Sequence, residues 1–480
     1  MVKGQAGTGK TTMALQVLEE LSGPDRSFYV STRVSDESLY NLFPWLREKE
    51  MRGRVVDASR EFLRALYERA ENENKEVKAA DKKTAGAKAF LRSINREKSP
   101  TRVDRTHLTT LMQDYDLLEV KRLYDRIEEK LPNQCLVVVD SIEGITTKYK
   151  IPPEDLVCAL QKDLVENTST HLVLVMEFAD DTSVDYLVDG VINLTRSSTE
   201  GRRIREVHLE KLRATEIMQP IYLTTLRGGR FKVFEPFAPA VTTGAWKVTP
   251  NPAAHYSTGT PDIDALLGGG FSVGSYNVIE VGNDVSNDQY LSVVRPLLLN
   301  FLSHGLGATA VLTGGDHVEA LREDLTRFLP PTTFDRLFYV TDYSLSHSDK
   351  PNVLPLKDKK PEEALALWQR VMGAIRGKEN KPLMDFVGFD TLEYRFGDIA
   401  IQDLFRTVSN IKVSKDLGIG ILKPGLKLQQ EILNMADTYL RVVNIHRACC
   451  IYGVKPQTSL HVVHPDPERG YPHVSLTPIL

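Results

Sequence analysis

The sequence predicts an α/β fold of two tandem domains, each a mainly parallel β-sheet flanked by helices. Strand-like and helix-like runs alternate along most of the 480 residues, which is typical of this class. Residues Leu136–Val139 are apolar at every position, as expected of a strand in a sheet that helices cover on both faces. The order of elements recurs in the second half, and 480 residues exceed the roughly 250 to 300 that a single core commonly reaches.

The first half begins with a glycine-rich loop, which is followed by a helix-forming run, an apolar strand and a second helix. After a polar stretch, another helix precedes the apolar strand that ends at Asp140, and two further strands follow. The expected strands are 28–34, 54–57, 136–139, 171–176 and 190–194, and the expected helices are 11–21, 37–48 and 117–131.

A proline-rich segment separates the halves. Residues 236–255 contain four prolines and little periodicity, which predicts a linker between domains at 1–235 and 256–480. Beyond it the same order of elements returns, which indicates an internal duplication. The expected strands are 276–281, 308–313, 337–341 and 386–389, and the expected helices are 290–302, 317–328 and 361–375.

Composition limits the class of protein. With 60 basic and 64 acidic residues the net charge is -4, without the positive balance that general nucleic-acid binding favours. The four cysteines lack metal-ligand spacing, and the adjacent Cys449 and Cys450 are poorly placed to bridge each other. No signal peptide and no apolar run of about 18 residues is present. We therefore expect a reduced, cytoplasmic protein without a membrane partner.

The segment Gly4–Thr11 matches the phosphate-binding pattern G-x-x-x-x-G-K-[ST] at every specified position. Its glycines let backbone N–H groups turn toward phosphates, and the following helix adds its positive end. Lys10 would reach the β and γ phosphates and Thr11 would hold Mg²⁺; a glycine-rich turn that only caps a helix would not explain these two residues. The residues expected to bind ATP are Gly4, Gln5, Ala6, Gly7, Thr8, Gly9, Lys10, Thr11 and Thr12.

A second expected part of the site is Asp140, which ends the apolar strand. A carboxylate at this place orients Mg²⁺ or its bound water in P-loop proteins, although an Asp after a strand can also cap a helix or stabilise a turn. Downstream of a complete phosphate-binding loop we favour the metal role. Thr11 and Asp140 are the expected metal ligands.

Several strings resemble a known family. Val2–Thr12, Val138–Ser141 and Lys211–Thr215 look like the RecA-fold ATPases of the KaiC and RadA type, and Ser257–Phe271 is similar to the segment that precedes the P-loop in KaiC-like domains. The tract Tyr29–Ser35 further resembles the archaeal gas-vesicle regulator GvpD subgroup. The resemblance covers both halves and implies two tandem RecA-like P-loop NTPase domains that assemble into a ring or filament.

The same resemblance implies that Lys211 and Arg213 reach the nucleotide of a neighbouring subunit, so that the partner is a second copy of the chain. Without the resemblance, two cations that alternate with the apolar Leu212 would be interpreted as an ordinary exposed strand face.

The family usually places two glutamates after the second strand, where one polarises the attacking water. Here Arg33–Val34 stands at that place, and Asp36 and Glu37 come a few residues late. Glu143 and Glu177 are alternative bases, or plain loop carboxylates. We therefore expect ATP binding with slow or switch-type hydrolysis, and the expected catalytic residues are Lys10, Asp140 and Glu177.

The second half has no equivalent phosphate loop. Its segment Gly282–Gln289 contains no lysine, and Asp284 and Asp288 would repel phosphate. Asp390 keeps the place of a metal-binding carboxylate, and Arg447 is interpreted as the counterpart of Arg213, with Ile445 replacing the lysine. We expect a degenerate domain that assembles or controls a partner.

The N-terminus also departs from the pattern. Only Met1, Val2 and Lys3 precede the loop, whereas a strand commonly has about five residues, and nothing like Ser257–Phe271 stands before it. We expect the native product to begin upstream of Met1.

A basic insertion is expected at about 52–105. Residues 82–105 contain 8 Lys or Arg against 2 Asp or Glu, so the insertion is either a nucleic-acid or acidic-partner site, or a solvated segment. Two functions follow: an ATP-binding regulator, or a DNA-dependent ATPase of the recombination and repair type. Arg33–Val34 and the lack of a recognisable DNA-binding module favour the regulator.

Overall fold

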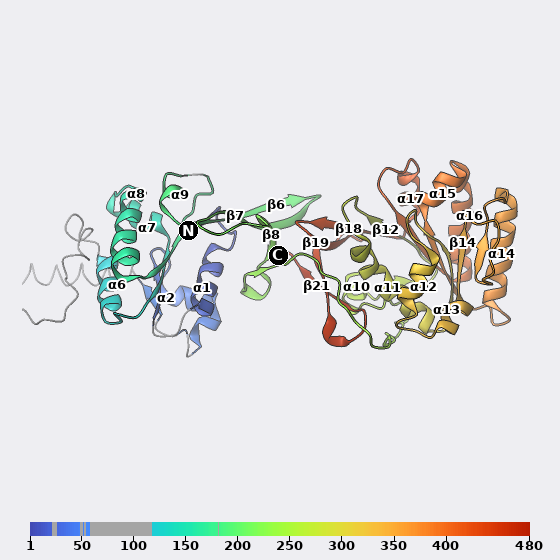
Figure 1. Ribbon diagram of the computed structural model, residues 1–480, viewed down its shortest axis with the longest axis horizontal. Helices are drawn as coiled ribbons and strands as arrows, with labels where there is room; N and C mark the ends of the chain where they lie inside the picture. Colours follow the sequence, from blue (N-terminus) through green and yellow to red (C-terminus); the bar gives the residue numbers. More distant parts are fainter. Residues whose placement is uncertain (22–25, 49–50, 52–53, 58–117, 181) are drawn as a thin grey trace, which may run out of the picture. The chain divides into compact units, whose positions relative to one another are not determined.

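The computed structural model describes residues 1–21, 26–48, 51, 54–57, 118–180 and 182–480 (Figure 1). The basic insertion expected at 52–105 lies almost entirely outside these residues. The chain divides into two compact units. The first unit comprises Met1–Ser197 and Arg205–Val233, and the second comprises Ser198–Ile204 and Phe234–Leu480.

The first unit contains a nine-stranded sheet in the order β3-β2-β4-β5-β1-β6-β7-β8-β9. The strands from β3 to β6 run parallel, whereas β8 pairs antiparallel with both β7 and β9. The strands are β1 (Val2–Gly4), β2 (Ser27–Ser31), β3 (Val55–Asp57), β4 (Leu136–Asp140), β5 (His171–Val175), β6 (Gly190–Thr199), β7 (Arg202–Leu212), β8 (Ile221–Thr225) and β9 (Lys232–Val233).

Helices cover both faces of this sheet, as the apolar strand β4 shows. Val138 packs in one core cluster with Leu15 and Leu18 of α1, whereas Val137 and Val139 pack in another with α7 and α8. Alternate residues of a strand point to opposite faces, so a strand covered on both sides is apolar throughout. The helices are α1 (Lys10–Leu21), α2 (Asp36–Leu42), α6 (Leu118–Glu128), α7 (Ile142–Tyr149), α8 (Pro153–Leu160) and α9 (Val184–Leu187), with a π-helical turn at Gln161–Glu166 and 3₁₀ turns at Pro44–Arg47 and Arg227–Gly229.

The second unit contains a ten-stranded sheet in the order β15-β14-β13-β16-β17-β12-β18-β19-β20-β21, and a small sheet of β10 and β11. The strands from β15 to β18 are parallel and the last three are antiparallel additions. The strands are β10 (His255–Tyr256), β11 (Phe271–Ser272), β12 (Tyr276–Val281), β13 (Gly307–Val311), β14 (Phe338–Asp342), β15 (Val353–Pro355), β16 (Leu383–Gly388), β17 (Leu417–Leu422), β18 (Thr438–Ile445), β19 (Ala448–Lys455), β20 (His461–Pro465) and β21 (Val474–Pro478).

Apart from the additional edge strand β15, the two sheets have the same strand order. The central β12 lies between β17 and β18 just as β1 lies between β5 and β6. The mainly parallel α/β class is confirmed, and the shared order supports the duplication. The helices of the second unit are α10 (Pro261–Leu266), α11 (Asn287–Ser303), α12 (Val318–Leu325), α13 (Pro331–Leu337), α14 (Pro361–Arg376), α15 (Phe389–Phe396), α16 (Ile399–Ser414) and α17 (Gln429–Met435), with a 3₁₀ turn at Pro467–Arg469.

Two expected elements of the first unit end early. The strand expected to reach Val34 ends at Ser31, because Ser35 already caps α2 by accepting a hydrogen bond from the backbone N–H of Ser38. The helix expected to reach residue 48 ends at Leu42, because Pro44 cannot continue an α-helix and starts a 3₁₀ turn instead.

The segment expected as a linker has no helix or strand before His255, yet it is packed against the second unit. Trp246 is buried in the main core of that unit, and its backbone N–H donates to the Phe328 carbonyl at 3.0 Å. The Gly244 N–H donates to the Gly470 carbonyl at 2.6 Å. Within the described ranges, no helix is both long and apolar enough to cross a membrane.

Candidate functional site

The phosphate-binding pattern lies where the central strand β1 leads into α1. The loop between them is residues 5–9, and α1 begins at Lys10. Gly4 has φ = +147°, and a Cβ atom there would lie 2.3 Å from the Leu194 carbonyl oxygen of β6. Gly9 has φ = +105°. Positive φ angles and this close approach require glycine at both ends of the loop.

Lys10 is buried and turns back over the loop. Its Nζ donates hydrogen bonds to the carbonyls of Gly4 at 2.6 Å and Gln5 at 2.9 Å. Burial lowers the pKa of the ammonium group, and the charges of Glu177, then Asp140, act against this. The cation thus lies within the loop, as the phosphate-binding role requires.

The two expected metal ligands meet at the end of β4. Thr11 Oγ1 donates to Asp140 Oδ2 at 2.7 Å, and the Tyr29 hydroxyl donates to the same oxygen at 2.5 Å. Burial first, and then the Asp140 charge, raise the pKa of Tyr29. A carboxylate and a hydroxyl oxygen side by side suit Mg²⁺, a cation that prefers oxygen ligands. The sequence places Tyr29 in a predicted strand and in the GvpD-like tract, but it does not predict this contact with Asp140.

Neighbouring contacts hold the ends of β2 and β4 together. The Ser141 N–H donates to Thr32 Oγ1 at 2.8 Å, and Thr32 Oγ1 donates to the Ser141 carbonyl at 2.9 Å. A Cβ atom on Gly144 would lie 2.2 Å from Thr32 Oγ1. Because Arg33 follows Thr32 directly, this close packing fixes the position of Arg33 relative to Asp140.

The carboxylates considered as bases lie beside this corner. Arg33 Nη1 pairs with Glu177 Oε2 at 2.5 Å, and the Glu177 N–H donates to Glu143 Oε1 at 2.8 Å. Glu143 is buried, and its other oxygen has no hydrogen-bond partner among the residues that the structure describes. Asp36 and Glu37 instead form the first turn of α2. Arg33 therefore pairs with a carboxylate near the site, at the place where the resemblance would put a glutamate.

Two arginines that were not predicted from the sequence as site residues lie against the loop. Arg205 of β7 is buried, and its Nη1 donates to the Gly7 carbonyl at 2.8 Å. A Cβ atom on Gly7 would lie 3.4 Å from Arg196 Nη1 of β6. Both arginines are far from the loop in sequence, and no local pattern distinguishes them from other strand cations.

Lys211 and Arg213 are located elsewhere in the same unit. Lys211 Nζ donates to the Asp185 carbonyl at 2.9 Å, and Arg213 Nη1 pairs with Asp189 Oδ1 at 2.8 Å. Lys211 follows Arg205 by six residues along β7, which is about 20 Å of extended chain. The two cations thus contact the region of α9, and Arg205 of the same strand contacts the loop.

The matching place in the second unit is closed by its own side chains. Residues 282–286 join β12 to α11, so Asn287 stands where Lys10 begins α1. Ser286 Oγ accepts a hydrogen bond from the Gln289 N–H, and Gln289 Oε1 accepts one from the Ser286 N–H. This capping box satisfies N–H groups that a phosphate loop would present to its ligand. Asp284 and Asp288 are exposed beside it.

Asp390 and Arg447 of the second unit are expected to be counterparts of Asp140 and Arg213 of the first unit. Asp390 Oδ2 accepts from the Gly314 N–H at 2.7 Å and lies 3.8 Å from Lys423 Nζ. The pairing of Arg447 with Arg213 is wrong. Strand order equates β18 and β19 with β6 and β7, so Arg447, in the turn between β18 and β19, corresponds to the β6–β7 turn and not to the end of β7.

Comparison with known proteins gives matches along most of the chain. The family model described as the P-loop domain of GvpD gas vesicle protein matches residues 1–69 and 93–210, and the model described as GvpD basic region 2 matches 245–480. Protein GvpD2 of Halobacterium salinarum is 28% identical over 497 residues, covering 99% of this chain and 92% of the relative. Protein GvpD1 of the same organism is 23% identical over 549 residues, covering 99% and 93%.

Proposed function

The chain belongs to the GvpD family of gas vesicle proteins, and we propose that it is an ATP-binding regulator within that family. Its first unit binds ATP with Mg²⁺ and hydrolyses it slowly, as a switch. Its second unit serves assembly or the control of a protein partner. The P-loop family match includes Gly4–Thr11, which supports the nucleotide role of this segment.

The observation that carries the proposal is the meeting of the loop, Lys10 and Asp140 at one end of the sheet. Backbone N–H groups at the start of α1, a buried ammonium group and a Thr11–Asp140 contact of 2.7 Å supply the groups needed for phosphates and Mg²⁺. The capping box of Ser286 and Gln289 leaves no such set at the matching place in the second unit. We therefore assign one ATP site to the described part of the chain.

Slow hydrolysis follows from the pairing of Arg33 with Glu177. A general base must accept a proton from water through a carboxylate oxygen within reach. Glu177 Oε2 is held by Arg33, and Glu143 Oε1 is engaged by the Glu177 N–H. Each candidate base is thus engaged through one oxygen, and we interpret this partial restraint as favouring a cytoplasmic switch over a motor.

The decisive experiment compares nucleotide affinity in two variants by titration calorimetry with Mg-ATP. Lys10→Ala is expected to weaken ATP binding at least tenfold, because it removes the cation that reaches the β and γ phosphates. The control Asp288→Ala changes the corresponding helix start of the second unit and should leave the affinity within about twofold. Equal losses in both variants would refute the one-site proposal.

The same preparation separates the regulator from a DNA-dependent ATPase. ATP turnover is measured with and without DNA across a salt series. Little change on adding DNA supports the regulator, and strong, salt-sensitive stimulation supports the alternative.

A further inference from the structure

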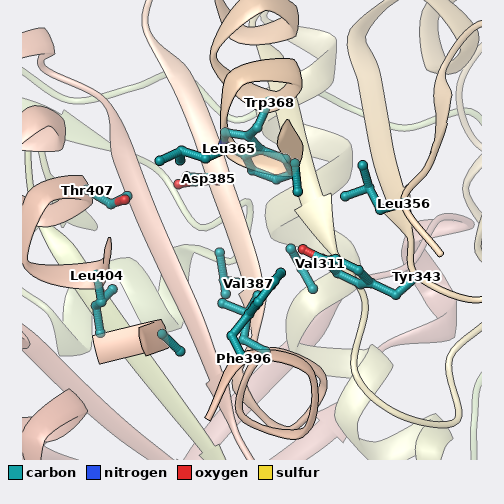
Figure 2. A pocket seen from close by; sticks show the side chains of 13 residues that line it. Val311, Tyr343, Leu356, Leu365, Trp368, Asp385, Val387, Phe396, Leu404 and Thr407 are labelled. Atoms are coloured by element: carbon teal, nitrogen blue, oxygen red, sulfur yellow. The ribbon is translucent and has the colours of Figure 1, made fainter. Parts of the chain in front are cut away.

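The second unit contains a cavity of about 110 Å³ whose lining includes no residue of the loop 282–286. It lies between the sheet strands β13 and β16 and the helices α14, α15 and α16 (Figure 2). A single water molecule needs roughly 10 to 15 Å³ on this type of measure. The cavity therefore has room for a molecule of about the size of one aromatic ring.

Apolar and aromatic side chains form most of the wall. Val387 of β16, Leu404 of α16 and Trp368 of α14 line it from three elements (Figure 2). Tyr343 and Phe396 stack edge to face at one end, with ring centroids 5.6 Å apart. Such walls favour an apolar ligand body, and aromatic faces also attract cations.

One carboxylate interrupts this apolar lining. Asp385 of β16 is 4% exposed and lines the cavity. Its Oδ1 accepts a hydrogen bond from Thr309 Oγ1 at 3.0 Å, whereas Oδ2 has no hydrogen-bond donor in the described part of the chain. A buried carboxylate without a full set of donors is costly, so a ligand that supplies one gains affinity.

Burial, and then the charge of Asp416, raise the pKa of Asp385 to about 6. Arg376, a cation whose charge opposes this shift, is bound to Asp416, with Nη1 3.0 Å from Oδ1. With a pKa of about 6, Asp385 is mostly ionised at pH 7.5, and the charge of Arg376 is shared with Asp416. Arg406 of α16 lines the neighbouring cavity together with Asp385. Two tyrosines, Tyr276 of β12 and Tyr343, also lie near Asp385, and their raised pKa values keep both hydroxyl groups neutral.

A route to the cavity runs beside the same carboxylate. A second cavity of about 290 Å³ shares Leu365, Trp368, Asp385 and Thr407 with the first and continues between α14 and α16. Asp385 thus stands where the two spaces join. A ligand can place its apolar body in the first cavity and its polar end at this junction.

We propose that this cavity binds a small organic ammonium ion, whose apolar body contacts the aromatic wall and whose N–H group donates to Asp385. A phosphate or carboxylate ligand would be repelled by Asp385, and a neutral apolar molecule would leave the carboxylate without its donor. The site lies wholly in the second unit and does not depend on the proposed ATP function.

The test measures, by titration calorimetry, the affinity of the full chain for 2-phenylethylamine and for its neutral isostere 2-phenylethanol. At pH 7.5 the amine should bind at least tenfold more tightly than the alcohol. Between pH 7.5 and pH 5 amine affinity should fall about tenfold, because Asp385 is then protonated while the amine stays charged. Equal binding of the two probes, no binding of either, or amine affinity that does not change with pH would overturn the proposal.

Variants locate the site. Asp385→Asn should remove the preference for the amine, and the matched exposed control Asp349→Asn should keep it. Ala400→Phe, which fills the cavity, should weaken both probes at least tenfold. Unchanged discrimination in Asp385→Asn would overturn the assignment, and the wild-type pH series decides the proposal even where a variant does not fold.

Discussion

Arg33 and Glu177 form the ion pair on which the proposed slow hydrolysis at the P-loop depends. Their side chains come from the ends of β2 and β5, which are separated by β4 in the sheet. The guanidinium group binds one oxygen of Glu177, beside a loop where a free carboxylate would activate water. If the first unit hydrolyses ATP as proposed, this pair would slow the reaction.

Removing the arginine should release the carboxylate. Arg33→Ala is expected to raise steady-state phosphate release at saturating Mg-ATP about three- to tenfold, which is a modest part of the usual effect of a general base. Adding Glu177→Gln to that variant should cancel the gain. Arg47→Ala, which changes another exposed arginine of the same unit, is the control and should have no effect. Turnover that falls in Arg33→Ala would contradict this role.

At the scale of single elements, α1 and α11 follow equivalent strands of the two sheets, but their first turns differ in which groups bind the backbone N–H groups. In α1 the first turn follows a glycine loop and carries Lys10 and Thr11, whereas α11 begins with a capping box of Ser286 and Gln289. Backbone N–H groups at a helix start bind either an external anion or an internal side chain. The start of α11 is therefore stabilised by its own side chains at the place where an anion could otherwise bind.

This difference predicts a stability effect without a nucleotide effect. Ser286→Ala should lower the free energy of unfolding by about 1 kcal/mol, because it removes the helix cap. Ser286→Asp, which can also cap, should lose much less. Denaturant unfolding measures the stability, and Mg-ATP titration should give the wild-type affinity for both variants. A new ATP site in Ser286→Ala, or equal stability of all three proteins, would contradict this interpretation.

At the scale of the whole molecule, two sheets share the same strand order apart from β15, and we propose one phosphate site, in the first unit. The second copy keeps the fold while its loop is closed by the capping box. In the proposed function, this second unit serves assembly or the control of a protein partner. Lys211 and Arg213 then matter only if copies of the chain assemble, because within one chain they contact the region of α9.

Assembly can be tested together with turnover. Light scattering with Mg-ATP reports the mass of the protein, and phosphate release is measured over a range of protein concentrations. If Arg213 acts on a neighbouring nucleotide, Arg213→Ala should lower turnover of the assembled form about tenfold with ATP affinity unchanged. The exposed Arg203→Ala is the control. A protein that stays monomeric with ATP would leave Lys211 and Arg213 as surface charges.

Features that depend on local geometry could be predicted from the sequence. The spacing of Gly4, Lys10 and Thr11 and the fully apolar Leu136–Val139 identified the loop and its sheet, because glycine conformation and strand burial are properties of neighbouring residues. The absence of a lysine in Gly282–Gln289 likewise indicated a changed loop.

The contacts between distant side chains became visible in the folded chain. It brought Arg33 to Glu177, placed Arg205 against Gly7, and showed that Arg447 corresponds to a hairpin turn. It also buried Asp385 in the wall of a mostly apolar cavity. These contacts depend on strand order and register in a sheet, which join residues far apart in the chain and leave no periodic trace along it.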